Sequence, residues 1–387
     1  MTRWIVTFMS VVVAAVTAVA DSTQSGVDTH VAALRSTDAA VRARAACALK
    51  DLGTKAVAAI PMLIETLADA TPVNPDVCGH RNWGWRGDPG EPTTPGREAA
   101  SALASIGQAA FRALIDALRD PRWSARKNAA FALGALDDRR AVDPLVSALE
   151  DPEAGVRREA AWALGALDDA RSVPPLIAAL KDQDGRVRSQ VAWALGAIDD
   201  QRAAGPLSSA LEDPESAVRR QAAWALGAID APSAVPALVS AMRDADALVR
   251  AQVAWALGAI DDRAAVAALV AALEDRDAGV RSQAAWALGA IGDTRATTGL
   301  VAALKDVEAR VRSQAAWALG AIDDRAAVDG LVGALKDQDA RVRSQAAWAL
   351  GAIGDGRAAN ALAAALKDED PHVRRQAAWA LGVVSGR

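Results

Sequence analysis

Tryptophan recurs every 31 residues from residue 162 to residue 379 of this chain, each time inside the string AWALG. The positions are Trp162, Trp193, Trp224, Trp255, Trp286, Trp317, Trp348 and Trp379. A fixed period of this size is typical of stacked repeats, because one unit cannot bury its apolar face without its neighbours. The chain is therefore predicted to be an array that displays the same surface chemistry at every step.

One period, residues 323 to 353, contains two amphipathic segments separated by a polar break at residues 336 to 340. Apolar residues at helical spacing mark the first segment, helix A: Val328, Leu331, Val332 and Leu335. A second stripe marks helix B: Val342, Ala346, Ala349, Leu350 and Ile353. These periods predict an amphipathic helical hairpin in each unit. We expect an all-α fold, an α-solenoid of stacked hairpins.

The repeated order of Asp, Val-Arg, Ala-Ala, Ala-Leu-Gly and Asp resembles the HEAT-like repeats of the PBS-lyase (bilin lyase) type. The resemblance covers roughly residues 26 to 387, in about eleven copies, and Cys47, Ser101 and Phe131 take the tryptophan position in the first three. It implies that Asp337 and Arg343, spaced by six residues, belong to a ladder between repeats. The motif implies the fold and leaves the activity open, because such repeats host many functions.

The first twenty residues differ from the repeats. Arg3 precedes an apolar run that ends in Ala18-Val19-Ala20, the pattern of a cleaved signal peptide. We therefore expect a signal peptide at residues 1–20, a solenoid at residues 21–387, and an exported, periplasmic or extracellular protein without a membrane span after cleavage. The formal net charge of -5 gives no electrostatic support for nucleic-acid binding.

A segment rich in proline and glycine, residues 70–96, interrupts the second repeat. Loops of this length are usually functional or disordered, and Trp83, Trp85 and His80 are its candidate binding residues. Cys47 and Cys78 are either free thiols or a disulfide, which would stabilise the fold by roughly 3 to 4 kcal/mol. A metal site at Asp76, Cys78 and His80 lacks a complete tetrahedral ligand set, so no metal and no cofactor are predicted.

The tryptophan column lies off the buried stripe of helix B. On a helical wheel Trp348 falls beside Gln345, away from Val342 and Leu350. The resemblance to HEAT repeats places helix B on the concave side. The indoles either cover the neighbouring helix or, together with Gln283, Gln314 and Gln345, line a groove that grips an extended ligand. Both readings stay open here.

Enzymatic alternatives find little support in the residues. Deoxyhypusine hydroxylase is a similar HEAT-like array, but its paired His-Glu motifs are absent: His30, His80 and His372 precede Val31, Arg81 and Val373. A bilin-lyase-like activity has no diagnostic residues that could be checked. A repeated surface supplies no unique catalytic constellation. We therefore expect no catalytic residues.

The sequence thus favours a non-catalytic module for protein–protein interaction or scaffolding in the cell envelope or outside the cell. Its partner is expected to be a protein. A bilin-lyase-like enzyme and a polysaccharide-binding protein that uses the indole row are the two alternatives. The C-terminal end keeps the consensus on its outer side and is a candidate for end-to-end self-association.

Overall fold

The computed structural model describes residues 25–79 and 92–386, in which two sets of helices alternate along the chain. After a helix at residues 25–33, the B helices are α2 (Ala39–Leu52), α4 (Pro95–Ile106), α6 (Trp123–Ala135), α8 (Ala154–Ala166), α10 (Gly185–Ile198), α12 (Ser216–Ala228), α14 (Ala247–Ile260), α16 (Ala278–Ile291), α18 (Ala309–Ile322), α20 (Ala340–Ile353) and α22 (Pro371–Ser385). The shorter A helices are α3 (Ile60–Thr66), α5 (Phe111–Ala117), α7 (Val142–Ala148), α9 (Val173–Ala179), α11 (Ala204–Ala210), α13 (Val235–Ala241), α15 (Val266–Ala272), α17 (Thr297–Ala303), α19 (Val328–Ala334) and α21 (Ala359–Ala365).

A 3₁₀ turn precedes each of these A helices, and the two elements together form the first half of the hairpin. The turns are η1 (Gly53–Ala59), η3 (Gly107–Ala110), η4 (Arg139–Ala141), η5 (Ala170–Ser172), η6 (Gln201–Ala203), η7 (Pro232–Ala234), η8 (Arg263–Ala265), η9 (Thr294–Ala296), η10 (Arg325–Ala327) and η11 (Gly356–Ala358). In η10 the Asp324 carboxylate accepts a hydrogen bond from the Ala326 N–H, which tightens the entry to α19. Helix α19 still covers almost all of the predicted apolar stripe, because the more tightly wound 3₁₀ turn lies before Val328, the first residue of that stripe.

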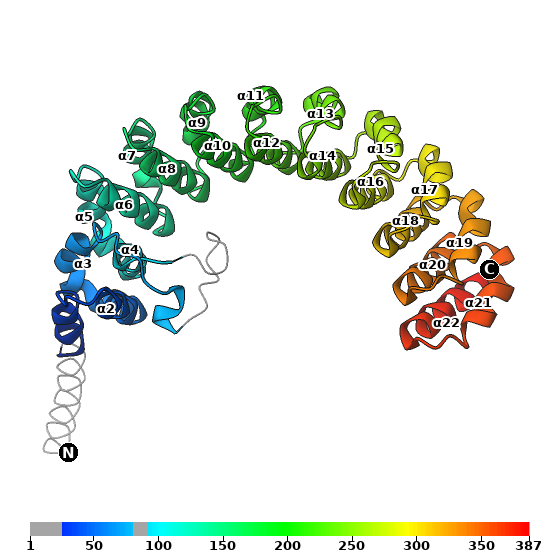
Figure 1. Ribbon diagram of the computed structural model, residues 1–387, viewed down its shortest axis with the longest axis horizontal. Helices are drawn as coiled ribbons and strands as arrows, with labels where there is room; N and C mark the ends of the chain where they lie inside the picture. Colours follow the sequence, from blue (N-terminus) through cyan, green and yellow to red (C-terminus); the bar gives the residue numbers. More distant parts are fainter. Residues whose placement is uncertain (1–24, 80–91, 387) are drawn as a thin grey trace, which may run out of the picture. The chain divides into compact units, whose positions relative to one another are not determined.

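The chain divides into two compact units, Met1–Val187 and Arg188–Arg387, with the boundary inside α10. Within each unit, consecutive B helices pack against one another, as α14 does against α16. Each A helix packs on the B helix that follows it, as α15 does on α16. Figure 1 shows the resulting two layers, with A helices on one side of each unit and B helices on the other. The predicted all-α solenoid of helical hairpins is confirmed.

The ends of each B helix follow from short-range chemistry. The Asp339 carboxylate accepts the Arg341 N–H and starts α20. Gly354 ends it with a φ of 64°, and its N–H is donated to the Leu350 carbonyl. Other copies place aspartate in this left-handed position, at Asp137, Asp168, Asp199, Asp230, Asp261 and Asp323. Asp and Gly are among the residues that tolerate this conformation, so the helix stops at the same point in each copy.

The core lies between the two layers and matches the apolar stripes of the sequence. Val342, Ala346, Ala349 and Leu350 are fully buried, and Ile353 is nearly so. The A helices contribute residues such as Val328 and Leu331, which are also fully buried. Because every copy repeats these positions, the core extends along each unit rather than growing in width.

The insertion in the second repeat contains little regular structure among residues 67–79 and 92–94. Its elements there are η2 (Pro75–Cys78) and an isolated antiparallel bridge between Val73 and Thr93. Helix α4 begins at Pro95, where the Thr94 hydroxyl accepts the Arg97 N–H. The two described ends of the insertion are therefore held together at its base.

Candidate functional site

Seven tryptophans of the repeated column lie over a glycine of the preceding B helix. A Cβ atom placed on Gly320 would come within 2.7 Å of the Trp348 Cζ3 atom and of the Ala349 Cα atom. The same contact pairs Gly134 with Trp162, Gly196 with Trp224, Gly227 with Trp255, Gly258 with Trp286, Gly289 with Trp317, and Gly351 with Trp379. One edge of each of these indoles therefore contributes to packing between repeats, and only glycine leaves room for it.

The other side of the column remains accessible. The side chains are half-buried at Trp162, Trp193, Trp224, Trp255, Trp286, Trp317 and Trp348, and Trp379 is 46% exposed. Gln283, Gln314 and Gln345 lie one turn earlier on the same helices and are also half-buried. Within the described chain their amides form no hydrogen bond. We call the surface formed by Trp286, Trp317, Trp348 and these three glutamines the Trp–Gln face.

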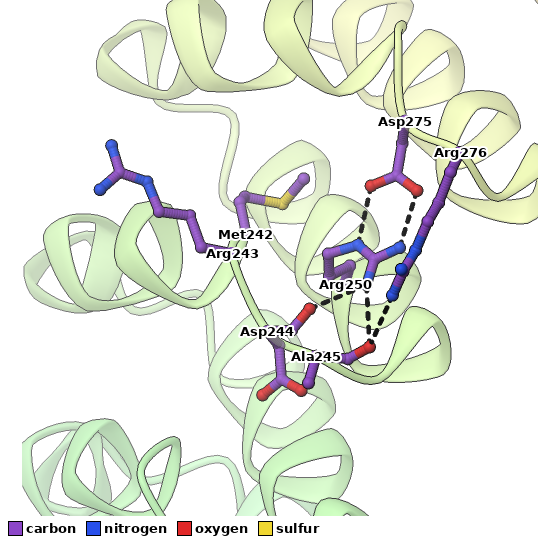
Figure 2. Close-up of a pocket in the computed structure, with 7 residues that line it drawn as sticks. All are labelled: Met242, Arg243, Asp244, Ala245, Arg250, Asp275 and Arg276. Atoms are coloured by element: carbon purple, nitrogen blue, oxygen red, sulfur yellow. Dashed lines mark hydrogen bonds and ion pairs between the residues drawn. The ribbon is translucent and has the colours of Figure 1, made fainter.

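A second repeated feature, the Arg–Asp ladder, joins the turns between helices A and B. The Arg250 guanidinium donates two hydrogen bonds to the Asp275 carboxylate of the next repeat, each 2.7 Å long. Its third nitrogen donates to the Asp244 carbonyl at 2.8 Å (Figure 2). The ladder comprises Arg42–Asp69, Arg126–Asp151, Arg157–Asp182, Arg188–Asp213, Arg219–Asp244, Arg250–Asp275, Arg281–Asp306, Arg312–Asp337 and Arg343–Asp368. The inter-repeat bridging predicted for Asp337 and Arg343 is confirmed.

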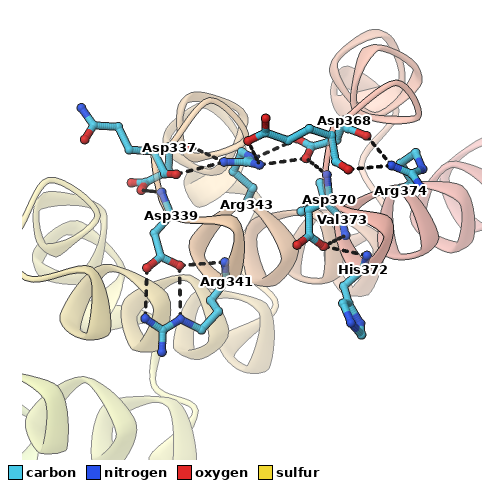
Figure 3. Close-up of polar contacts among 11 residues, drawn as sticks. Asp337, Asp339, Arg341, Arg343, Asp368, Asp370, His372, Val373 and Arg374 are labelled. Carbon is cyan, nitrogen blue, oxygen red and sulfur yellow. Dashed lines mark hydrogen bonds and ion pairs between the residues drawn. The ribbon is translucent and has the colours of Figure 1, made fainter.

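The ladder carboxylates are charged and saturated with hydrogen bonds. Burial acts to raise the pKa of Asp337, but hydrogen bonds from the Arg312 side chain and the Asp339 N–H bring that pKa below its ordinary value of 3.8. Figure 3 shows the next step, where Arg343 lies between the Asp368 carboxylate and the Asp337 carbonyl. With its donors and acceptors used internally, the ladder offers few groups to a ligand.

The second repeat departs from this scheme. Gly96 takes the place of the ladder arginine in the second repeat, and a Cβ atom there would lie 2.6 Å from the Leu67 carbonyl oxygen. Arg97 instead extends across the neighbouring repeat, with its guanidinium carbon 3.2 Å from the centroid of the Phe131 ring. One guanidinium nitrogen of Arg97 lies 2.9 Å from a carboxylate oxygen of the buried Glu159. Phe131 stacks in turn on Trp162, with ring centroids 5.1 Å apart.

The two cysteines meet at the base of the insertion. Cys47 and Cys78 form a disulfide, with Cα atoms 5.9 Å apart. The Glu98 carboxyl lies beside them, 3% exposed, with one oxygen 3.6 Å from the Cys47 sulfur. Its other oxygen accepts a hydrogen bond from the Thr93 hydroxyl at 2.8 Å. Cys47 holds the tryptophan position of its repeat, so the insertion is attached at the start of the tryptophan column.

Some predicted residues fall outside the described chain, namely His80, Trp83, Trp85 and the signal peptide at residues 1–20. Sequence reasoning missed three others, Glu98, Arg97 and Glu159. Glu98 and Glu159 occupy the position held by glutamine in later repeats. A buried carboxylate at a position that is otherwise a neutral amide is the signal that could have singled them out.

These features define a class of protein: an all-α solenoid whose repeats share one ladder and one aromatic column. Matches to sequence profiles identify the family within this class. The profile of HEAT repeats matches residues 111–190, 173–249, 235–316 and 297–382, and that of the PBS lyase HEAT-like repeat matches residues 41–69. The chain belongs to the HEAT repeat family, which confirms the resemblance drawn from its motifs.

The chain is similar to several solved structures. A crystal structure of an engineered protein is 24% identical, covers 93% of this chain and 99% of its own, and superposes with a TM-score of 0.51. Human deoxyhypusine hydroxylase in complex with glycerol is 28% identical over 72% of this chain and 96% of its own, with a TM-score of 0.31. The Escherichia coli protein YibA is 23% identical over 63% of this chain and 92% of its own, with a TM-score of 0.48. No curated protein matches the chain.

The helices were also compared with the requirements of a membrane span. Among the residues that the structure describes, none of the helices combines the length and the apolar character needed to cross a bilayer.

Proposed function

We propose that this HEAT repeat protein is a non-catalytic scaffold that binds a protein partner through its Trp–Gln face. The observation that carries the proposal is the state of the polar groups there. The amides of Gln283, Gln314 and Gln345 are half-buried and make no hydrogen bond within the described chain. A half-buried amide without a partner has free donor and acceptor groups to offer a ligand.

The indoles supply the second half of the argument. Trp286, Trp317 and Trp348 use one edge to cover a glycine, and each residue remains partly exposed. Aromatic side chains with one packed and one exposed edge are common at protein interfaces. The segment VRSQAAWALGAI is identical in these three repeats, so a ligand meets the same groups at each step. An extended polypeptide suits this surface, because its backbone also offers a repeating series of donors and acceptors.

The proposed location is outside the cytoplasm, in the cell envelope or the surrounding medium. It is supported by the apolar run and the Ala18-Val19-Ala20 cleavage pattern of the N-terminal segment. Fractionation of the native host, followed by sequencing of the mature N-terminus, tests this part. A mature chain beginning near Asp21 is expected.

A blocking variant tests the binding face without disturbing the core. Ser282, Ser313 and Ser344 precede the three glutamines, and other repeats carry Arg158, Arg220 and Arg375 at this position. The fold therefore accepts arginine there. Changing all three serines to arginine is expected to abolish co-purification of the partner from the exported fraction.

The matched control places three arginines on the A helices instead. Ala271, Ala302 and Ala364 are exposed at equivalent positions of α15, α17 and α21. Ala271→Arg, Ala302→Arg and Ala364→Arg together should retain every partner that the wild type retains. If both variants bind equally well, the Trp–Gln face is not the binding surface.

A polysaccharide remains the second candidate ligand, because partly exposed indole rings also stack against sugar rings. Titration with soluble cell-wall polymers separates the two. Quenching of tryptophan fluorescence in the wild type and the control, and not in the blocking variant, would favour the polymer over the polypeptide.

A further inference from the structure

The base of the insertion brings together three side chains of metal-ligating type. Cys47, Cys78 and Glu98 each offer one ligand atom, and these atoms all lie within 4.8 Å of one another. Cys47 and Glu98 are 7% and 3% exposed, and Cys78 is half-buried. The three residues come from α2, η2 and α4, so the fold holds them in place from three different elements.

The spacing of these ligand atoms fits a zinc site in the reduced protein, in which the disulfide between Cys47 and Cys78 is broken. Zinc binds thiolate sulfur at about 2.3 Å and carboxylate oxygen at about 2.1 Å, and tetrahedral geometry then separates the two ligand atoms by about 3.6 Å. The Cys47 sulfur and the nearer Glu98 oxygen are 3.6 Å apart. The carboxylate therefore already stands where a ligand beside Cys47 must stand.

The surroundings of Glu98 also fit a ligand role. The Thr93 hydroxyl donates to one carboxylate oxygen at 2.8 Å, which leaves the other oxygen beside Cys47. Thr93 is fixed in turn by its bridge to Val73. Such outer hydrogen bonds orient the ligands of metal sites. Among the described residues no arginine or lysine pairs with Glu98, in contrast to Glu159, which binds Arg97.

We propose that the dithiol form of this protein binds one Zn²⁺ through Cys47, Cys78 and Glu98, with water in the fourth position. A dithiol reductant supplies two electrons and two protons, which convert the disulfide into two thiols while the reductant becomes a disulfide. Zn²⁺ then binds both sulfurs and releases their two protons to solvent. The site thus links the insertion to the first repeat in either state, by a covalent bond or by a metal ion.

Cobalt provides a direct test because a Co²⁺–thiolate bond absorbs light. The full chain is reduced with a dithiol, freed of reductant under nitrogen, and titrated with Co²⁺. One equivalent should produce thiolate-to-cobalt charge-transfer absorption, and one equivalent of Zn²⁺ should abolish it. The oxidised protein should show no such absorption. Absence of the band after two thiols have been counted overturns the proposal, as does failure of the native protein to yield two thiols.

A matched pair of variants identifies the third ligand. Glu98→Gln and Glu159→Gln both install the residue that later repeats carry at the same position, as at Gln283, so both should fold. Glu98→Gln should weaken Co²⁺ binding at least tenfold, and Glu159→Gln should leave it unchanged. Equal affinities in the two variants would exclude Glu98 as a ligand. None of these outcomes depends on the Trp–Gln face, so this proposal can fail independently of the proposed function.

Discussion

The Arg–Asp ladder and the Trp–Gln face recur with the same period, and they differ in how their polar groups are satisfied. Arg250 donates to the Asp275 carboxylate and to two backbone carbonyls, and it is 5% exposed. The amides of Gln283, Gln314 and Gln345 have no such partners in the described chain. The two features therefore share a period but differ in the state of their hydrogen bonds.

The largest expected effect comes from acid, which acts on the whole ladder at once. The pKa of Asp337 is lowered in the folded state, as are those of Asp275 and Asp306. A lowered folded-state pKa contributes stability that is complete above the ordinary value of 3.8 and is lost as the pH falls through the folded-state pKa. The denaturant midpoint, followed by circular dichroism, should fall steeply below pH 4. A midpoint that is the same at pH 2 and pH 7 would contradict this role for the ladder.

Gly320→Val tests whether the indole column also contributes to the stability of the fold. The Cβ atom of the introduced side chain would lie 2.7 Å from both Trp348 and the backbone of Ala349. We expect a loss of stability of about 3 kcal/mol from this overpacking. Urea denaturation measures it, with Gly333→Ala as the control. Gly333 has open space around it on α19, so that variant should gain roughly 0.5 kcal/mol or more.

Arg250→Ala removes one step of the ladder. It leaves the Asp275 carboxylate without its two guanidinium donors, and we expect a loss of about 2 kcal/mol. Arg341→Ala is the matched control, because Arg341 binds Asp339 with a side chain that is 81% exposed. That change should cost less than about 1 kcal/mol. Similar urea midpoints for the two variants would remove the distinction between the ladder and ordinary surface ion pairs.

The smallest effect on stability is expected on the Trp–Gln face itself. Changing Gln283, Gln314 and Gln345 together to alanine breaks no hydrogen bond within the described chain and should shift stability by under about 0.5 kcal/mol per site. Partner binding should nevertheless weaken, as measured by retention on an immobilised column. A marked drop in thermal stability would instead show that these amides have a structural role, as the Arg–Asp ladder does.

Much of this fold could be predicted because its contacts repeat with the sequence. The hairpin, the buried stripe around Leu350 and the bridging by Arg343 depend on neighbours at constant spacing. The position of Trp348 off the core was also readable from a helical wheel. The contact between Trp348 and Gly320 recurs at the same spacing between other adjacent repeats, so the sequence of one period describes the contact in those repeats as well.

The non-repeated contacts could not be predicted in this way. Glu98 reaches Cys47 across 51 residues of sequence, and Arg97 reaches Glu159 across 62. The insertion lies between Cys47 and Glu98, so no period specifies the first contact. The second contact depends on Glu159, at a position where later repeats carry glutamine. Conversely, the signal peptide and the residues His80, Trp83 and Trp85 stay predictions, because they lie outside the described residues.

The B helices of the second unit meet through equivalent contacts, so such a chain can change in length by whole repeats. Arg281 meets Asp306 and Gly289 meets Trp317 in the same way that Arg312 meets Asp337 and Gly320 meets Trp348. The ladder and glycine–tryptophan contacts of these repeats are therefore interchangeable. After loss or duplication of one period, such as residues 293–323, each remaining ladder arginine would still meet an aspartate, and each remaining helix B glycine would still meet a tryptophan. The array can thus gain or lose whole repeats while the chemistry of its repeated surface stays constant.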